Sequence, residues 1–136
     1  VQTVELALIV ARDVTIGLAT IHELGYYHGD IKPANLWIEP HTDRTKLGCY
    51  QCKIIDFGLG RAAGAGRDTS RFWKTPKYAA LEQFTGETSP RSDFFSLGVV
   101  LYELVTGRLP FPGKTDFEIM GRIRDQSPVP PARLNP

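Results

Sequence analysis

Apolar residues recur every three or four positions along the first part of the chain. The recurring positions are Ala7, Leu8, Ala11, Val14, Leu18, Ile21 and Leu24. This spacing predicts one long helix that begins near Val4 and carries a single apolar stripe. We expect Gly25 to end this helix. His22, near the helix end, is expected to be a surface residue or to complement the helix dipole, and not to bind a ligand.

Two later segments also carry helix signals. The Ser-Pro pair at 89–90 suits a helix start, and apolar residues occupy nearly every side of the segment from there to Gly107. This pattern predicts a helix buried at the centre of the fold. Residues 115–118 match a capping box that begins a short helix ending near Arg124. The proline-rich residues 128–136 are expected to form a connector without helix.

Strand signals lie between the two long helices. Residues 36–38 and 52–55 favour strands, and the simplest arrangement joins them as a hairpin. The connection at 39–50 is long for a hairpin and predicts a surface excursion. The glycine-rich residues 57–71 are expected to be mobile, and residues 79–84 can form a helical turn or two.

The composition describes one ordinary globular domain. The chain has 136 residues, of which 42% are hydrophobic and 23% charged, enough for one packed core. Its 16 basic and 15 acidic residues give a formal net charge of +1, so we expect no nucleic-acid partner and no membrane contact by this segment. No apolar run approaches the length needed to cross a bilayer. Because the first residue is valine rather than methionine, we expect an interior part of a longer protein.

The chain has two cysteines, Cys49 and Cys52, in a Cys-Tyr-Gln-Cys run. Such a pair can be redox-active or supply half of a zinc site, but a structural zinc needs four ligands and the sequence has no second pair. We therefore interpret them as two reduced thiols in a surface loop. This interpretation is compatible with a reducing compartment.

Residues 28–35 combine an acid, a cation and an amide in a segment that Pro33 keeps from being helical. The Asp30 carboxylate can orient a hydroxyl nucleophile, and the Lys32 ammonium can offset charge on a phosphoryl group. The Asn35 amide oxygen can hold Mg²⁺. The combination suits phosphoryl transfer. Each residue type alone is common in turns, so the interpretation depends on the rest of the chain.

Three motifs occur in one order. A His-x-Asp run ends at Asp30 and precedes Asn35, an Asp-Phe-Gly run at 56–58 follows a strand, and an Ala-Leu-Glu run at 80–82 precedes the central helix. Together they resemble the signature of eukaryotic-type (Hanks-type) serine/threonine protein kinases of the bacterial branch. The resemblance implies an α+β, protein kinase-like fold, a mainly helical large C-terminal lobe with a short β-hairpin, truncated at both ends. Residues 1–136 would then form a partial protein kinase domain.

The resemblance also implies roles for individual residues. Asp30 is similar to the catalytic aspartate that accepts the proton of the substrate hydroxyl, and Lys32 to the lysine that reaches the transferred phosphoryl group. Asn35 and Asp56 resemble the two magnesium-binding residues beside ATP. Thr75 resembles the threonine that hydrogen-bonds the catalytic aspartate and lysine. The implied ligands are ATP and Mg²⁺, and the implied partner is a protein substrate with serine or threonine.

Other residues support or depart from this pattern. Asp93 resembles the helix-start carboxylate that braces the backbone of the catalytic loop. Gly29 replaces the usual arginine, Lys74 a glycine and Leu81 the proline of Ala-Pro-Glu. Because that arginine pairs with a phosphorylated activation loop, our hypothesis is that the protein works without phosphorylation of this loop. Glu82 is expected to lack the arginine with which it pairs in other kinases.

The activity implied by the resemblance is transfer of the γ-phosphoryl group of MgATP to serine or threonine hydroxyls, in the cytoplasm. No glycine-rich phosphate-covering loop and no strand lysine stand in these 136 residues, so the isolated chain is expected to be inactive. One alternative is a pseudokinase that acts as a binding or scaffold module, which the departures at Gly29, Lys74 and Leu81 leave open. Another is a small-molecule kinase of related fold. Tyr78 and the 80–82 motif favour a peptide-docking segment instead.

Overall fold

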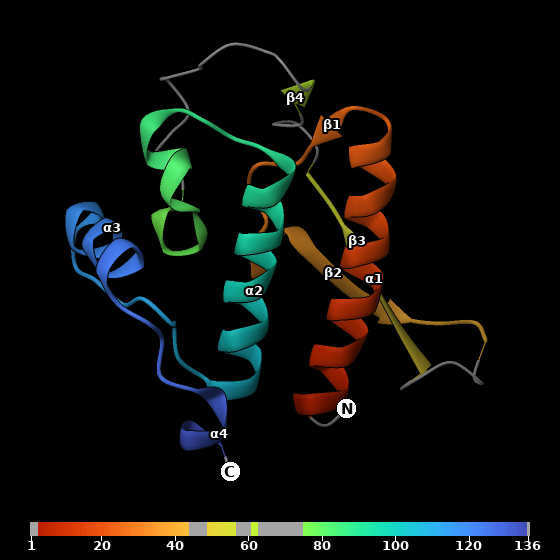
Figure 1. Ribbon diagram of the computed structural model, residues 1–136. Coiled ribbons are helices and arrows are strands. Elements are labelled where there is room, and N and C mark those ends of the chain that lie inside the picture. Colours follow the sequence, from red (N-terminus) through yellow and green to blue (C-terminus); the bar gives the residue numbers. More distant parts are fainter. Residues whose placement is uncertain (1–2, 44–48, 57–60, 63–74, 136) are drawn as a thin grey trace.

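The computed structural model describes residues 3–43, 49–56, 61–62 and 75–135 (Figure 1). Its α-helices are α1 (Thr3–Glu23), α2 (Pro90–Thr106), α3 (Asp116–Asp125) and α4 (Pro131–Leu134), and its 3-10 helices are η1 (Pro33–Asn35), η5 (Pro76–Tyr78) and η6 (Leu81–Thr85). The strands are β1 (Tyr26–Tyr27), β2 (Leu36–Pro40), β3 (Tyr50–Ile54) and β4 (Arg61–Ala62). In the described ranges, β1 pairs with β4 and β2 with β3 in two small antiparallel sheets. The expected α+β class is confirmed.

Helices α1 and α2 pack side by side and build the core (Figure 1). The buried cluster comprises Ile9, Val10, Val14, Leu18, Ile31, Cys52, Leu97 and Val100. The expectation that Leu8 and Leu24 share the buried stripe is wrong, because they are 53% and 70% exposed. With about 3.6 residues per turn, Leu8 lies almost opposite Val10 on the helix, and Leu24 lies beyond the last helical residue.

Helix α2 occupies the central place that its apolar sequence predicts, between α1 and the segment that holds η5 and η6 (Figure 1). It begins after Ser89 and ends at Gly107, whose φ of 70° is the left-handed conformation that glycine adopts without strain. Phe94 is an exception to the burial, with 42% of its surface exposed.

The predicted hairpin is present as β2 and β3, with Leu36 opposite Ile54 and Pro40 opposite Tyr50. Both strands extend further toward the turn than the apolar pattern indicates, so the connection is shorter than expected. Cys52 lies within β3 and is 6% exposed, and the expectation that both cysteines lie in a surface loop is therefore wrong. Both side chains are thiols, as expected, and Cys49 is exposed.

The C-terminal part follows the expected order with one correction. Thr115 Oγ1 accepts a hydrogen bond from Glu118 N at the start of α3, as the capping pattern predicts. The prediction of a connector without helix is wrong for α4, which begins at Pro131, because proline suits the first position of a helix. The Tyr102 hydroxyl donates to Val129 O at 2.7 Å and attaches this segment to α2. Among the described residues, no helix is both long and apolar enough to cross a membrane.

Candidate active site

The loop from His28 to Asn35 connects β1 to β2 and is held by Asp93 in the first turn of α2. Asp93, 1% exposed, accepts hydrogen bonds from His28 N at 2.9 Å and from Gly29 N at 2.7 Å. Gly29 has a φ of 79°, a conformation that costs a side-chain-bearing residue energy. The expectation that Asp93 braces this loop is confirmed.

The same carboxylate has a third partner that the sequence did not reveal. His22 Nε2 lies 2.9 Å from Asp93 Oδ2, and the His22 side chain is only 12% exposed. Its ring also packs edge-on against Phe94, with centroids 5.3 Å apart. The expectation of a surface histidine is wrong, because Asp93 stands 71 positions away and no local pattern shows that contact.

His28 connects Asp30 to the end of the segment that carries Asp56. Its ring is fully buried, with Nε2 3.1 Å from Ile55 O, and its Nδ1 accepts a hydrogen bond from Asp30 N at 3.2 Å. Because a carbonyl oxygen only accepts, Nε2 carries the proton and Nδ1 is the acceptor, which is the neutral imidazole. Asp30 is thereby connected to the residue that precedes Asp56.

The residues expected to perform the chemistry lie together. Lys32 Nζ is 2.7 Å from Asp30 Oδ2 and donates to Thr75 Oγ1 at 2.8 Å, so the ammonium lies between the two. Asn35 Nδ2 donates to Asp30 O at 2.8 Å and lies 3.3 Å from Asp30 Oδ2. The Asp30 oxygen Oδ1 has no partner among the described residues.

Asp56 is brought to the same region by backbone contacts. Ile55 N donates to Asn35 O at 2.9 Å, which fixes the end of β3 against η1. Asp56 itself is exposed and has a φ of 61°, a conformation uncommon for residues other than glycine and found at functional sites. Its carboxylate therefore reaches solvent next to the loop that carries Asp30.

The donor set at this place fits Mg²⁺. The Asn35 amide nitrogen faces Asp30, which leaves its oxygen Oδ1 without a hydrogen bond among the described residues. An amide oxygen and a carboxylate are hard ligands of the kind that Mg²⁺ selects, and Mg²⁺ completes its coordination with phosphate oxygens and water. In the part of the chain that the structure describes, no group of three His, Cys, Asp or Glu side chains could hold a metal by itself.

The segment around η5 and η6 is fixed to α2 by two side-chain contacts. Tyr78 Oη donates to Glu103 Oε2 at 2.6 Å, and burial together with this carboxylate raises the pKa of Tyr78 above its usual value. Ser92 Oγ donates to Glu82 Oε1 at 2.6 Å. The expectation that Glu82 lacks a partner is therefore incomplete, since a hydroxyl satisfies one of its oxygens. Lys74 and the glycine-rich residues 57–71, for which we expected mobility, lie outside the described residues, apart from β4.

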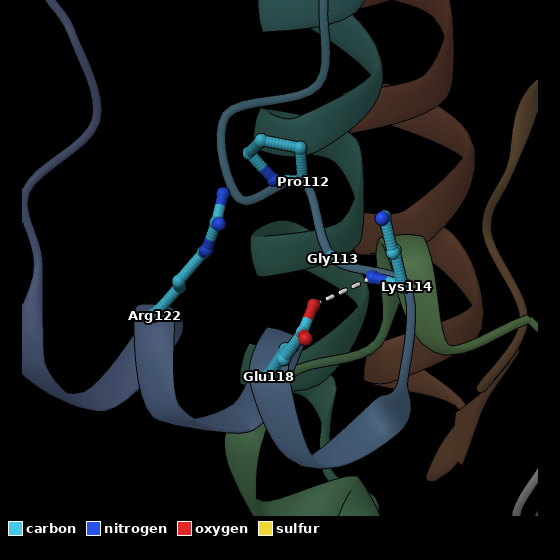
Figure 2. A pocket seen from close by; sticks show the side chains of 5 residues that line it. All are labelled: Pro112, Gly113, Lys114, Glu118 and Arg122. Atoms are coloured by element: carbon cyan, nitrogen blue, oxygen red, sulfur yellow. Dashed lines mark hydrogen bonds between the residues drawn. The ribbon is translucent and has the colours of Figure 1, made fainter.

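A groove of about 480 Å³ lies elsewhere, between the α2–α3 connection and α3 (Figure 2). Its lining residues are Pro112, Gly113, Lys114, Glu118 and Arg122. The Glu118 carboxylate turns toward the backbone of Lys114 and accepts a hydrogen bond from its N–H at 2.8 Å (Figure 2). None of the residues at 28–35 lines this groove, so we assign it no part in phosphoryl transfer.

Comparison with known proteins decides the family. Residues 3–132 match the protein kinase domain. The chain belongs to the protein kinase family. Members of this family use ATP and Mg²⁺ and act on protein substrates. The expected kinase-like fold is confirmed by this match.

Three similar curated proteins come from bacteria. A serine/threonine-protein kinase named drp72 from Corynebacterium efficiens is 37% identical over 135 residues, 96% of this chain and 24% of the relative. PknB from Mycolicibacterium smegmatis is 36% identical, over 93% of this chain and 20% of the relative. PknL from Mycobacterium tuberculosis is 41% identical, over 81% of this chain and 26% of the relative. The resemblance to bacterial serine/threonine kinases is thus confirmed, and the chain spans about a quarter or less of these relatives.

Proposed function

We propose that this chain carries the catalytic loop of a serine/threonine protein kinase that transfers the γ-phosphoryl group of MgATP to a hydroxyl of a protein substrate. The supporting observation is the contact series from Asp30 through Lys32 to Thr75. It places the Lys32 ammonium within hydrogen-bond reach of both a carboxylate and a hydroxyl, and a carboxylate beside a cation suits phosphoryl transfer. Residues 1–136 would form part of the large lobe of the kinase domain.

Asp30 is the group that orients the nucleophile. Its Oδ2 is occupied by Lys32 and Asn35, which leaves Oδ1 to accept the hydrogen bond of a serine or threonine hydroxyl. As the hydroxyl oxygen forms its bond to the γ-phosphorus, the bond to the β,γ-bridging oxygen breaks and ADP leaves with that electron pair. The hydroxyl proton passes to Asp30 Oδ1.

Lys32 stabilises the charge that moves during transfer. Its side chain is 19% exposed and its ammonium lies beside the carboxylate, where it can contact both the phosphoryl oxygens and Asp30. The Thr75 hydroxyl accepts one of its three N–H groups and fixes its direction. A lysine two positions after the aspartate, with a threonine in contact, is the arrangement that the resemblance associates with serine/threonine substrates.

Asn35 Oδ1 and the Asp56 carboxylate are the proposed ligands of Mg²⁺. A bound Mg²⁺ would supply positive charge that offsets the negative charge of the phosphate groups. Asn35 is held by its amide nitrogen on Asp30, and Asp56 by the backbone of Ile55 on Asn35, so both ligands are oriented before ATP arrives. The cytoplasm contains ATP and keeps thiols such as those of Cys49 and Cys52 reduced, so we propose that the reaction takes place there.

The test uses the protein expressed from its whole reading frame, with Mg²⁺, γ-labelled ATP and matched peptides that carry serine, threonine or tyrosine. We expect label on the serine or threonine peptides, loss of labelling with EDTA, and a loss of at least about a hundredfold in Asp56→Asn. Asp125→Asn, an exposed carboxylate, is the matched control. Nucleotide binding without transfer would contradict the proposal in favour of a pseudokinase, and labelling of tyrosine alone or of a small-molecule hydroxyl would also contradict it.

A further inference from the structure

Both polar groups of the Gly29 backbone are bound by side chains from distant parts of the chain. The N–H donates to Asp93 Oδ1 at 2.7 Å, and the carbonyl accepts from Gln83 Nε2 at 2.9 Å. Gln83 lies in η6, 54 positions away, and is 8% exposed. A buried glutamine with a partner this remote is not explained by the packing of its own short helix.

The direction of the Gln83 amide is determined by its other end. Gln83 Oε1 accepts a hydrogen bond from Ala80 N at 2.9 Å in a buried contact. Because a backbone N–H can only donate, the atom facing Ala80 is the oxygen and the atom facing Gly29 O is the nitrogen. The amide nitrogen is therefore fixed in place and donates one of its two N–H groups to the catalytic loop.

That contact acts on the peptide unit that carries Asp30. The unit between Gly29 and Asp30 is planar, so the Gly29 oxygen and the Asp30 nitrogen move together. Gln83 holds the oxygen and His28 Nδ1 holds the N–H at 3.2 Å. With both ends of this plane fixed, the position of the Asp30 Cα is fixed. Asn35 Nδ2 donates to Asp30 O at 2.8 Å and holds the next peptide unit, so the two units together set the direction of the Asp30 side chain.

The Gln83 contact links residues 75–85 to the catalytic loop, and it is not alone. Another link is the hydrogen bond from Lys32 to Thr75. The Ser92 hydroxyl holds Glu82, the neighbour of Gln83, against the start of α2 at 2.6 Å. The η6 helix is thus a fixed support from which Gln83 reaches the loop.

We propose that Gln83 is a positioning residue for Asp30, which orients the catalytic carboxylate by fixing the Gly29–Asp30 peptide plane. The inference rests on the proposed kinase function. Gly29 has no side chain that could bind a phosphate on the activation loop. The hydrogen bond from Gln83 holds the catalytic loop without any phosphate. In this role Gln83 itself contacts neither substrate nor ATP.

The test compares Gln83→Glu and Gln83→Met with Gln126→Glu in the protein expressed from its whole reading frame. Gln83→Glu keeps the acceptor for Ala80 N but places an oxygen against Gly29 O, and Gln83→Met keeps the volume without a donor. Gln126 is exposed and makes the same charge change outside the site. We expect both Gln83 variants to lower kcat for peptide phosphorylation by at least about tenfold, with KM for ATP within about twofold.

Two further readings separate positioning from loss of structure. Hydrolysis of ATP by water should change less than transfer to peptide, because only the oriented hydroxyl needs Asp30. The amide hydrogen of Asp30 should exchange at least about tenfold faster in Gln83→Met, a reading that does not depend on activity. A kcat within twofold of wild type in folded variants, unchanged Asp30 exchange, or an equal loss of ATP affinity, hydrolysis and transfer would overturn the inference. A wild-type protein without transfer would contradict the proposed function, and the Asp30 exchange would still decide the role of Gln83.

Discussion

The Asp93 carboxylate offers the most direct test of how the catalytic loop is held. It is 1% exposed and accepts from His28 N at 2.9 Å, from Gly29 N at 2.7 Å and from His22 Nε2 at 2.9 Å. The substitution Asp93→Asn keeps the shape of the side chain but leaves one acceptor oxygen where there were two. One backbone N–H of the loop then faces an NH₂ group instead of an oxygen.

The magnitude follows from these contacts. If the remaining oxygen stays on Gly29 N, the buried N–H of His28 loses its acceptor, which costs about 1–3 kcal/mol. The bond to Gly29 loses its charge assistance, about 1 kcal/mol more. His22 can adopt the tautomer in which Nε2 accepts from the new NH₂ group and so adds little. The expected loss in free energy of unfolding is about 2–4 kcal/mol, a large part of a typical total of about 5–15 kcal/mol.

Urea unfolding monitored by circular dichroism measures this loss, and hydrogen exchange of the His28 amide reports the same contact locally. Asp125→Asn is the matched control, because that side chain is 56% exposed and its substitution should leave the free energy of unfolding nearly unchanged. An unfolding free energy for Asp93→Asn within 0.5 kcal/mol of wild type, roughly the size of a neutral surface change, would refute this account of the loop.

Three further predictions concern other parts of the molecule. Thr75→Val should lower kcat by about tenfold and Thr75→Ser by much less, because only the hydroxyl contacts the ammonium in the site; equal kcat values in steady-state assays would contradict this. Burial raises the pKa of the Cys52 thiol to about 12, so iodoacetamide at pH 8 should alkylate Cys49 first, and mass spectrometry showing equal rates would contradict it. Gly107→Ala places a side chain at a φ of 70° and should lower the free energy of unfolding by about 1 kcal/mol. Gly98→Ala, inside α2 with open space around it, should raise the free energy of unfolding by about 0.5–1 kcal/mol. Thermal unfolding measures both, and shifts of the same sign would show that the helix end is misassigned.

Local patterns in the sequence predict the elements that local physics determines. The three-and-four spacing of apolar residues predicts α1 and α2, and the capping pattern predicts α3 with the correct start. Strand β1, with only two residues, has no pattern of its own and exists because Tyr26 pairs with Ala62. Such a strand depends on chain segments that meet only in the folded state.

The candidate site divides in the same way. Six consecutive positions contain Asp30, Lys32 and Asn35. Because a short loop brings such near neighbours together, the sequence predicts them as a group. The contacts of His22 with Asp93 and of Gln83 with Gly29 cross 71 and 54 positions. Histidine near a helix end and glutamine in a short helix are ordinary surface residues by type, so the sequence carries no signal for their burial.

The rate of phosphoryl transfer by Asp30→Asn, in the protein expressed from its whole reading frame, tests most directly whether Asp30 accepts the proton of the substrate hydroxyl. The amide keeps the volume of the side chain but cannot take up the hydroxyl proton. We expect kcat for a serine or threonine peptide to fall by at least about a hundredfold, with ATP affinity nearly unchanged, since Asp30 acts on the nucleophile. A kcat within about tenfold of wild type would contradict the assignment of Asp30 as the proton acceptor.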